Sequence, residues 1–223
     1  MFLNLTSKAK FAVVTGVVSL VGGSATLIHD IITTESVEAI IKLRNFELID
    51  DDAKWAEVLE DYTREIKTQT DLKIPDFEGG TGKVEEFKKH CKQILSIKYR
   101  IADSLDLVDL ALWCVKQQTV SDYLIKNKYT LLKTDHRVYD KDNPMWDKKI
   151  KEYLQLPKEN TEDKISELKI TNSSLERVDE SDRTAFIEEC KKLSKIKHFD
   201  KNFEQSYTLS ALWCAEAPKE NKS

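Results

Sequence analysis

Apolar positions along the chain form one uninterrupted run, followed by a long region in which they recur at steps of three and four. The run, residues 11–28 (FAVVTGVVSLVGGSATLI), contains no charged residue. Eighteen helical residues extend about 27 Å, just enough for a thin hydrocarbon core. The later region has the period of amphipathic helices. The pattern therefore predicts an apolar N-terminal segment followed by a helical, water-exposed part.

Three interpretations of residues 11–28 compete. An uncleaved signal anchor would cross the lipid bilayer once, with Lys8 and Lys10 holding the N-terminus in the cytoplasm. A cleaved signal peptide is the second interpretation, because residues 22–25 are small enough for a cleavage site. A buried helix of a soluble protein is the third. We expect the anchor, with the bilayer as its partner; the first two interpretations both place residues 29–223 outside the cell.

Four blocks of the remaining chain recur in the same order, which indicates a diverged tandem duplication. The first block is a short apolar pattern that begins at Val37 in one copy and at Val120 in the other. The next three blocks are a Trp-x6-Tyr spacing, a Phe-x-x-x-Cys helix and a final Ala-Leu-Trp-Cys. The offset between the copies grows from 83 to 91, 99 and 100 residues, so insertions are needed only in the intervening loops. The aromatic residues expected to superpose as the repeat core are Trp55 on Trp146, Tyr62 on Tyr153, and Trp113 on Trp213.

Each copy is predicted to be a unit of four helices. Only six Gly and four Pro occur in 223 residues, which favours helices over a turn-rich β fold. A short helix (36–44 or 120–127) leads into an extended segment. The second helix is capped by residues 50–52 in the first copy and by Asn143 in the second. Polar stretches at 68–82 and 158–182 separate it from the third helix, and the fourth helix ends at Trp-Cys.

The predicted fold class is therefore all-α (mainly helical), with an N-terminal transmembrane helix followed by two tandem, diverged small helical units. Thr119 and Asp122 have capping-box spacing at the junction between the units. The predicted organisation is a cytoplasmic N-terminus at 1–10, a transmembrane signal anchor at 11–28, helical repeat 1 at 36–118, helical repeat 2 at 119–216 and a disordered tail at 217–223.

The cysteines follow the same repeat. Each copy has one Cys on its third helix and one at the end of its fourth. Consecutive helices joined by a short turn fold back antiparallel, which suits the bridges Cys91–Cys114 and Cys190–Cys214 if the Cα atoms come within about 7 Å. An exterior location makes their oxidation possible. The alternative is four reduced cysteines packed as small hydrophobes beside tryptophan.

This arrangement resembles the large paralogous families of uncharacterised surface and membrane proteins encoded by haemotropic mycoplasmas. The shared features are a short apolar N-terminal segment, a chain near 200 residues, F-x-L-L-like segments after a short helix, and a Trp-Cys pair that closes a helix at 113–114 and 213–214. The resemblance implies a surface-exposed member of an expanded family under immune pressure. It implies no catalytic residues.

Candidate chemistry is sparse. Residues 79–83 (GGTGK) look like a phosphate-binding loop, but Phe77 and Val84 stand where the full motif needs Gly and Ser or Thr. The four His do not correspond between the copies and no Cys-x-x-Cys occurs, so we expect no metal site.

The formal net charge is -4, and residues 29–223 carry -6 because Lys8 and Lys10 supply two positive charges. Such an acidic part lacks the attraction that a nucleic-acid binder needs. We expect no catalytic residue, cofactor or metal.

Two classes of function remain. The first is a membrane-anchored, surface-exposed interaction or antigenic protein that is not an enzyme, with host proteins or antibodies as possible partners. The second is a small-molecule binder or enzyme with a site between the two repeats. Topology, an acidic helical exterior and duplication without a polar cluster favour the first class.

Overall fold

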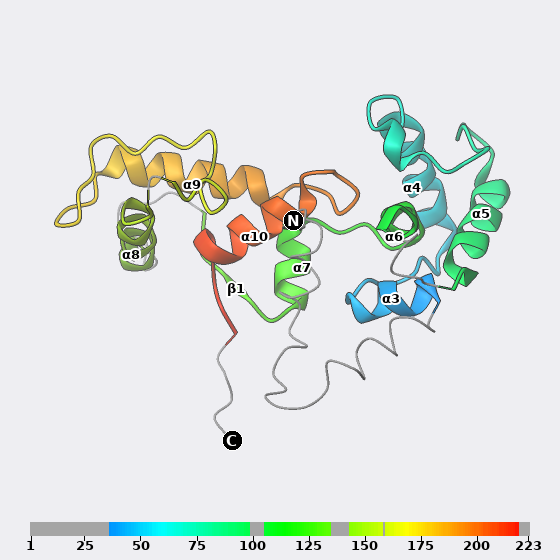
Figure 1. The fold of residues 1–223 in the computed structure, drawn as a ribbon, viewed down its shortest axis with the longest axis horizontal. Helices are drawn as coiled ribbons and strands as arrows, with labels where there is room; N and C mark the ends of the chain where they lie inside the picture. Colours follow the sequence, from blue (N-terminus) through cyan, green and yellow to red (C-terminus); the bar gives the residue numbers. More distant parts are fainter. Residues whose placement is uncertain (1–35, 99–104, 135–142, 158, 219–223) are drawn as a thin grey trace, which may run out of the picture. The chain divides into compact units, whose positions relative to one another are not determined.

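A computed structural model describes residues 36–98, 105–134, 143–157 and 159–218. The chain divides into two compact units, residues 1–117 and 118–223, which are described separately below and drawn in Figure 1. This division lies one residue before the repeat boundary expected from the sequence. The predicted anchor at 11–28 lies outside the described residues. Within the described ranges, no helix is long and apolar enough to cross a membrane.

Unit 1 consists of four α-helices and two 3-10 turns within its described part. In chain order, these elements are α3 (Val37–Leu43), α4 (Asp52–Glu65), η1 (Thr70–Leu72), α5 (Val84–Ser96), α6 (Leu105–Ala111) and η2 (Leu112–Cys114). Helix α5 packs against α3, α4 and α6. It occupies this central place because Phe87, Cys91, Ile94 and Leu95 share one buried face of the helix.

Within the residues described for it, unit 2 repeats the plan with four α-helices and one small sheet. Its elements are α7 (Val120–Lys126), β1 (Thr130–Leu131), α8 (Asn143–Leu154), α9 (Glu180–Ser194), α10 (Phe203–Trp213) and β2 (Ala215–Glu216). Helix α10 packs on α7 and α9, and α8 packs on α9. Strands β1 and β2 pair antiparallel, with Leu131 opposite Ala215. The fold is thus mainly helical, as predicted, and the extended segment after α7 adds one short strand pairing with the chain after α10.

The same backbone hydrogen bonds close both units. The amide of Val37 donates to the carbonyl of Ile97 (2.9 Å), and the amide of Val120 donates to the carbonyl of Ile196 (2.9 Å). These bonds tie the start of the first helix to the end of the third. A backbone hydrogen bond likewise ties the extended segment of each unit to the second cysteine of that unit. Equivalent bonds at equivalent positions are the structural mark of the duplication.

Local sequence accounts for several helix ends. The Asp51 carboxylate accepts a hydrogen bond from the Ala53 amide (2.8 Å) at the start of α4, so one residue of the predicted acidic cap acts as that cap. Thr119 and Asp122 form the predicted capping box at the start of α7. Helix α9 begins at Glu180, so the polar stretch predicted to extend to residue 182 ends in the first helical turn.

The first helix of each unit ends in the same left-handed turn. Asn45 (φ 65°) follows α3 and Lys128 (φ 66°) follows α7. In unit 2 the amide of Lys128 donates to the carbonyl of Ile125, and the next amide donates to Leu124, which is the Schellman pattern. Asn tolerates a left-handed backbone better than most residues, whereas Lys is strained there.

Replacing Lys128 with Gly is expected to stabilise unit 2 by about 0.5–1 kcal/mol, because relief of the left-handed strain exceeds the extra chain entropy of Gly. Hydrogen exchange of unit 2 amides measures the gain. The matched variant Asn45→Gly in unit 1 is expected to gain less. A loss of stability in Lys128→Gly would contradict the strain argument.

Candidate functional site

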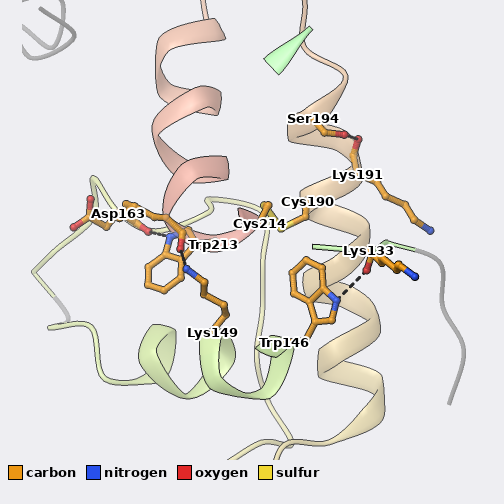
Figure 2. The surroundings of a disulfide bond; sticks show 10 residues. Lys133, Trp146, Lys149, Asp163, Cys190, Lys191, Ser194, Trp213 and Cys214 are labelled. Atoms are coloured by element: carbon orange, nitrogen blue, oxygen red, sulfur yellow. Dashed lines mark hydrogen bonds between the residues drawn. A yellow bond between two sulfur atoms is a disulfide. The ribbon is translucent and has the colours of Figure 1, made fainter. Parts of the chain in front are cut away.

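Both predicted disulfides are present in the structure, one inside each unit. Cys91 and Cys114 have Cα atoms 5.5 Å apart, and Cys190 and Cys214 have Cα atoms 5.6 Å apart. Figure 2 shows the second bridge, which joins α9 to the end of α10 beside Trp213. The bridges form because the third helix and the end of the fourth helical segment lie side by side in each unit.

Four aromatic residues of each unit make corresponding ring contacts, although the angles between the rings differ, and Phe77 adds a fifth ring in unit 1. The Tyr62 ring lies 5.4 Å from Phe87 and 5.3 Å, edge-on, from Trp113. In unit 2 the matching ring distances from Tyr153 are 5.5 Å to Phe186 and 5.2 Å to Trp213. Contacts between rings at these distances stabilise a core beyond the burial of their area.

The fourth ring differs between the units in its exposure. Trp55 and Trp146 contact the phenylalanine of the third helix at 5.8 and 6.2 Å. Trp146 is 1% exposed and donates to the Lys133 carbonyl (3.0 Å; Figure 2). Trp55 is only partly buried, so its assignment to the core is corrected to the rim of the core. Both tryptophans nevertheless contact the phenylalanine at the same position of the third helix, as the predicted equivalence of the two residues requires.

The hydroxyl of Tyr62 anchors the polar stretch that follows α4. It donates to the carbonyl of Phe77 (2.8 Å) and accepts from the amide of Ile74 (3.0 Å). The indole of Trp113 donates to the carbonyl of Leu72 (3.0 Å). Two side chains of the core thus satisfy three backbone groups of an irregular segment, which otherwise has no ladder partner.

Unit 2 repeats two of these three bonds at equivalent positions, and the third goes to a different carbonyl. The Tyr153 hydroxyl donates to the carbonyl of Ile165 (3.3 Å) and accepts from its amide (3.2 Å). The Trp213 indole donates to the carbonyl of Asp163 (2.7 Å), as Figure 2 shows. In both units the tryptophan acceptor lies two residues before the amide that binds the tyrosine. The anchors therefore match at the indole and at the amide that binds the hydroxyl, whereas the carbonyl that accepts from the hydroxyl lies three residues further along the chain in unit 1.

The polar stretches separate the second and third helices, as predicted, but they also contribute residues to the core. Within them, Ile74 is 1% and Phe77 0% exposed, and Ile165 is 4% exposed. A fifth repeated block carries these residues: residues 70–77 (TDLKIPDF) match residues 161–168 (TEDKISEL) at an offset of 91. The sequence itself contains this signal. The two blocks share only three identical residues, however, and a comparison that follows apolar periodicity alone overlooks them.

Removing the Tyr62 hydroxyl by Tyr62→Phe is expected to destabilise unit 1 by about 1–3 kcal/mol, because the Ile74 amide and the Phe77 carbonyl lose a buried partner. Hydrogen exchange of unit 1 measures the change. Tyr153→Phe is the matched variant; its hydrogen bonds are longer, and a smaller effect is expected. An unchanged unit 1 would show that water replaces the hydroxyl.

Burial changes the pKa of several groups in these cores. Burial raises the pKa of Tyr62 to about 12, so its hydroxyl stays protonated and able to donate. Burial also lowers the pKa of Lys149, whose ammonium donates to the Leu212 carbonyl at the end of α10 (2.5 Å; Figure 2). This contact satisfies one of the carbonyls that a helix end leaves open.

Asp182 fixes the loop that precedes α9. Burial by itself would raise the pKa of Asp182, but hydrogen bonds from the Thr171 and Asn172 amides and from Ser173 lower the pKa on balance. The two amides lie 3.2 and 2.8 Å from the carboxylate oxygens. The ionised form is therefore the form that holds the loop.

The hydrogen bonds of Asp182 predict an acid-sensitive loop. Because the pKa is lowered in the folded state, the stabilisation is complete above the unfolded pKa of about 3.9 and is lost as the pH falls through the folded pKa. Asp182→Asn is expected to cost about 1–3 kcal/mol at pH 7. The difference between this variant and the natural chain should shrink below pH 4, measured by denaturant unfolding at several pH values. A constant difference would contradict the role of the charge.

The other candidate motifs have structural roles. Gly79 has φ 68°, and a Cβ there would lie 2.4 Å from the Thr63 Oγ1, so this loop needs glycine for its path into α5. Within the described residues, no group of three or more His, Cys, Asp or Glu gathers to hold a metal ion. A shallow, open hollow runs along one face of α8, lined by charged residues including Lys148, Lys151 and Glu152.

The most distinctive constellation in the described part of the chain is thus the disulfide with its aromatic ring set, present once per unit. It closes each unit and anchors one irregular segment. In comparisons of the whole chain with known proteins, no protein-family profile, no curated protein and no solved structure matches it.

Proposed function

We propose that this chain is an exported, membrane-anchored surface protein whose two disulfide-closed units serve interactions with other proteins, including antibodies. Residues 11–28 act as the signal anchor in this proposal, with the N-terminus in the cytoplasm. The units lie outside the cell and present their exposed loops and helix faces. The proposal involves no catalytic step.

The single observation that carries the proposal is that all four cysteines are paired, one bridge per unit. Structural disulfides form and persist in oxidising compartments and are rare where thiol systems keep cysteines reduced. Small units also gain most from such bridges, because a core of this size supplies little stability by itself. The bridges therefore favour the two export interpretations of residues 11–28 over a buried helix of a cytosolic protein.

A loop present only in unit 2 supports an interaction role. The offset between the copies rises from 91 to 99 between the fifth block and the third helix, which places the insertion in residues 169–179. Ser174 donates its amide to the Arg177 carbonyl (2.8 Å), and Leu175 at the tip is 48% exposed. Unit 1 closes the same fold without this insertion. A hydrogen-bonded loop that unit 1 lacks is suited to recognition, because a loop held by its own bonds loses little entropy on binding.

The decisive experiment for the proposal is protease treatment of intact cells that express the chain with a tag after Ser223. Loss of the tag without lysis is expected, because the units lie outside. Replacing Lys8 and Lys10 with Glu is expected to disturb the orientation and protect the tag in part of the population. A tag on the natural chain that remains protected until lysis would overturn the proposal.

The role of the loop has its own measurement. Antibodies raised against the folded chain are titrated against a variant in which residues 174–177 are replaced by Gly and Ser. Binding is expected to fall, while hydrogen exchange in the rest of unit 2 is unchanged. Equal binding to both proteins would remove the loop from the proposed interaction surface.

A further inference from the structure

All four cysteine side chains lie inside the cores of their units. Cys91 and Cys114 are 0% exposed, Cys190 is 1% exposed and Cys214 is 5% exposed. A disulfide forms when a thiolate attacks a sulfur of the oxidant, so the oxidant must reach the cysteine directly. Once a unit has closed around its cysteines, an oxidant reaches them only when the unit opens.

The pairing follows the order of the chain. Each bridge joins consecutive cysteines, with separations of 23 and 24 residues. Four cysteines allow three pairings, and only this one keeps every bridge within a unit. The competing link between Cys114 and Cys190 closes a loop about three times longer, which is entropically less favourable. The native pairs are thus also the pairs that an open chain forms most readily.

The second cysteine of each pair also fixes the extended segment of its unit. The carbonyl of Cys114 accepts from the amide of Ile49 (3.2 Å), and the carbonyl of Cys214 accepts from the amide of Leu132 (3.0 Å). The indole next to this cysteine holds the polar stretch, as described above for Trp113 and Trp213. The Trp-Cys dipeptide at the end of each unit therefore holds three features in place: the extended segment, the polar stretch and the bridge.

We infer that this chain is the substrate of a dithiol-oxidising reaction that acts on each unit before the unit closes, and that the reaction needs no later reshuffling of bridges. The inference rests on the proposed export of the chain. The oxidant is a disulfide, either of a protein oxidase or of a small thiol. Both sources oxidise the cysteine pair by thiol–disulfide exchange.

The reaction balances as two exchange steps. One cysteine thiolate attacks the disulfide of the oxidant, forms a mixed disulfide and displaces the first sulfur of the oxidant as a thiolate. The second cysteine of the pair then attacks the mixed disulfide, closes the bridge and displaces the second sulfur. The cysteine pair loses two protons and two electrons, and the oxidant ends as two thiols.

The experiment compares two orders of addition with the full chain. In the first, the reduced and denatured chain is diluted directly into buffer that contains oxidised glutathione. In the second, it is diluted without oxidant until its circular dichroism is constant, and oxidised glutathione is added afterwards. Free thiols are alkylated at intervals and the bridges are identified by peptide mapping. A repeat with a protein dithiol oxidase distinguishes the two sources of the disulfide by rate.

With oxidant present from the start, Cys91–Cys114 and Cys190–Cys214 are expected to dominate without an isomerase. The prefolded reduced chain is expected to oxidise at least about tenfold more slowly, because the rate is limited by opening of the unit, and a few molar urea should restore the rate. If the reduced chain stays unfolded until oxidant is added, oxidation precedes folding directly, which also supports the inference.

Two outcomes would overturn the inference. The first is a folded, reduced chain that oxidises as fast as the unfolded chain. The second is early accumulation of a Cys114–Cys190 link that only an isomerase resolves. The variant with Cys190→Ser and Cys214→Ser is the control, and its remaining pair is expected to form at an unchanged rate. These results do not depend on where the tag lies in cells, so failure of the inference and failure of the proposed export are distinguishable.

Discussion

Removing one bridge by the double substitution Cys190→Ala and Cys214→Ala is expected to lower the free energy of unfolding of unit 2 by roughly 3 kcal/mol. The bridge closes 24 residues, and in the loop-closure model a cross-link of this length removes that amount of entropy from the unfolded chain. A loss of this size is a large share of the stability of a small domain. Both cysteines are replaced together because a lone thiol would be left free for disulfide exchange whenever the unit opens.

Hydrogen exchange with peptide resolution is the appropriate measurement, since a chain of two units need not unfold in one step. Faster exchange is expected in unit 2, and unit 1 should be unchanged, because the bridge closes a loop that lies within unit 2 alone. The variant with Cys91→Ala and Cys114→Ala is the matched control and should show the reverse. Equal loosening of both units would show that their stabilities are coupled. No change in either unit would show that the bridges contribute little.

Truncating Trp113 to Ala is expected to destabilise unit 1 by about 3–5 kcal/mol, the range for a large aromatic residue in a core. Trp113 is 0% exposed, contacts the Tyr62 ring edge-on and holds the carbonyl of Leu72. Its loss therefore leaves a cavity and a carbonyl without its partner. Denaturant unfolding, monitored by the hydrogen exchange of unit 1 amides, measures the effect.

Trp55→Ala is the control for this second prediction. Trp55 belongs to the same ring set but is only partly buried, and its ring contact is with Phe87. Truncation there is expected to cost clearly less, because part of the side chain is already in water. An equal cost at the two positions would contradict the distinction between the closed centre and the rim of the ring set.

The duplication and the disulfides could be predicted from sequence because both depend on spacing along the chain. Cys91 and Cys190 share helical faces with Phe87 and Phe186, and each unit ends in the same Trp-Cys pair. Helical periodicity assigns such residues to one face, and consecutive helices must fold back for those faces to meet. Local signals also placed the caps at Asp51 and Thr119, where a side chain binds an amide two or three residues away.

The polar anchor could not be assigned in this way. Tyr62 and Trp113 were expected in the core for their apolar rings, and nothing in their spacing indicates that their polar atoms bind the backbone at residues 72–77. Such bonds join groups 12 to 41 residues apart, and no local rule determines which distant backbone group a buried hydroxyl or indole reaches. Only the packed core brings these groups together, because a buried donor must find a partner.

The sequence by itself therefore determined the helical character, the two copies and the cysteine pairs of this protein, since all three follow from period and order. Tertiary structure alone decided that the irregular stretches enter the core, that Trp146 is covered while Trp55 lies at the rim, and that the segment after α7 pairs with the chain after α10. The physical reason is that burial and buried hydrogen bonds depend on which segments meet in space. Many segments of similar polarity compete for each contact, and the packing of the whole unit selects one.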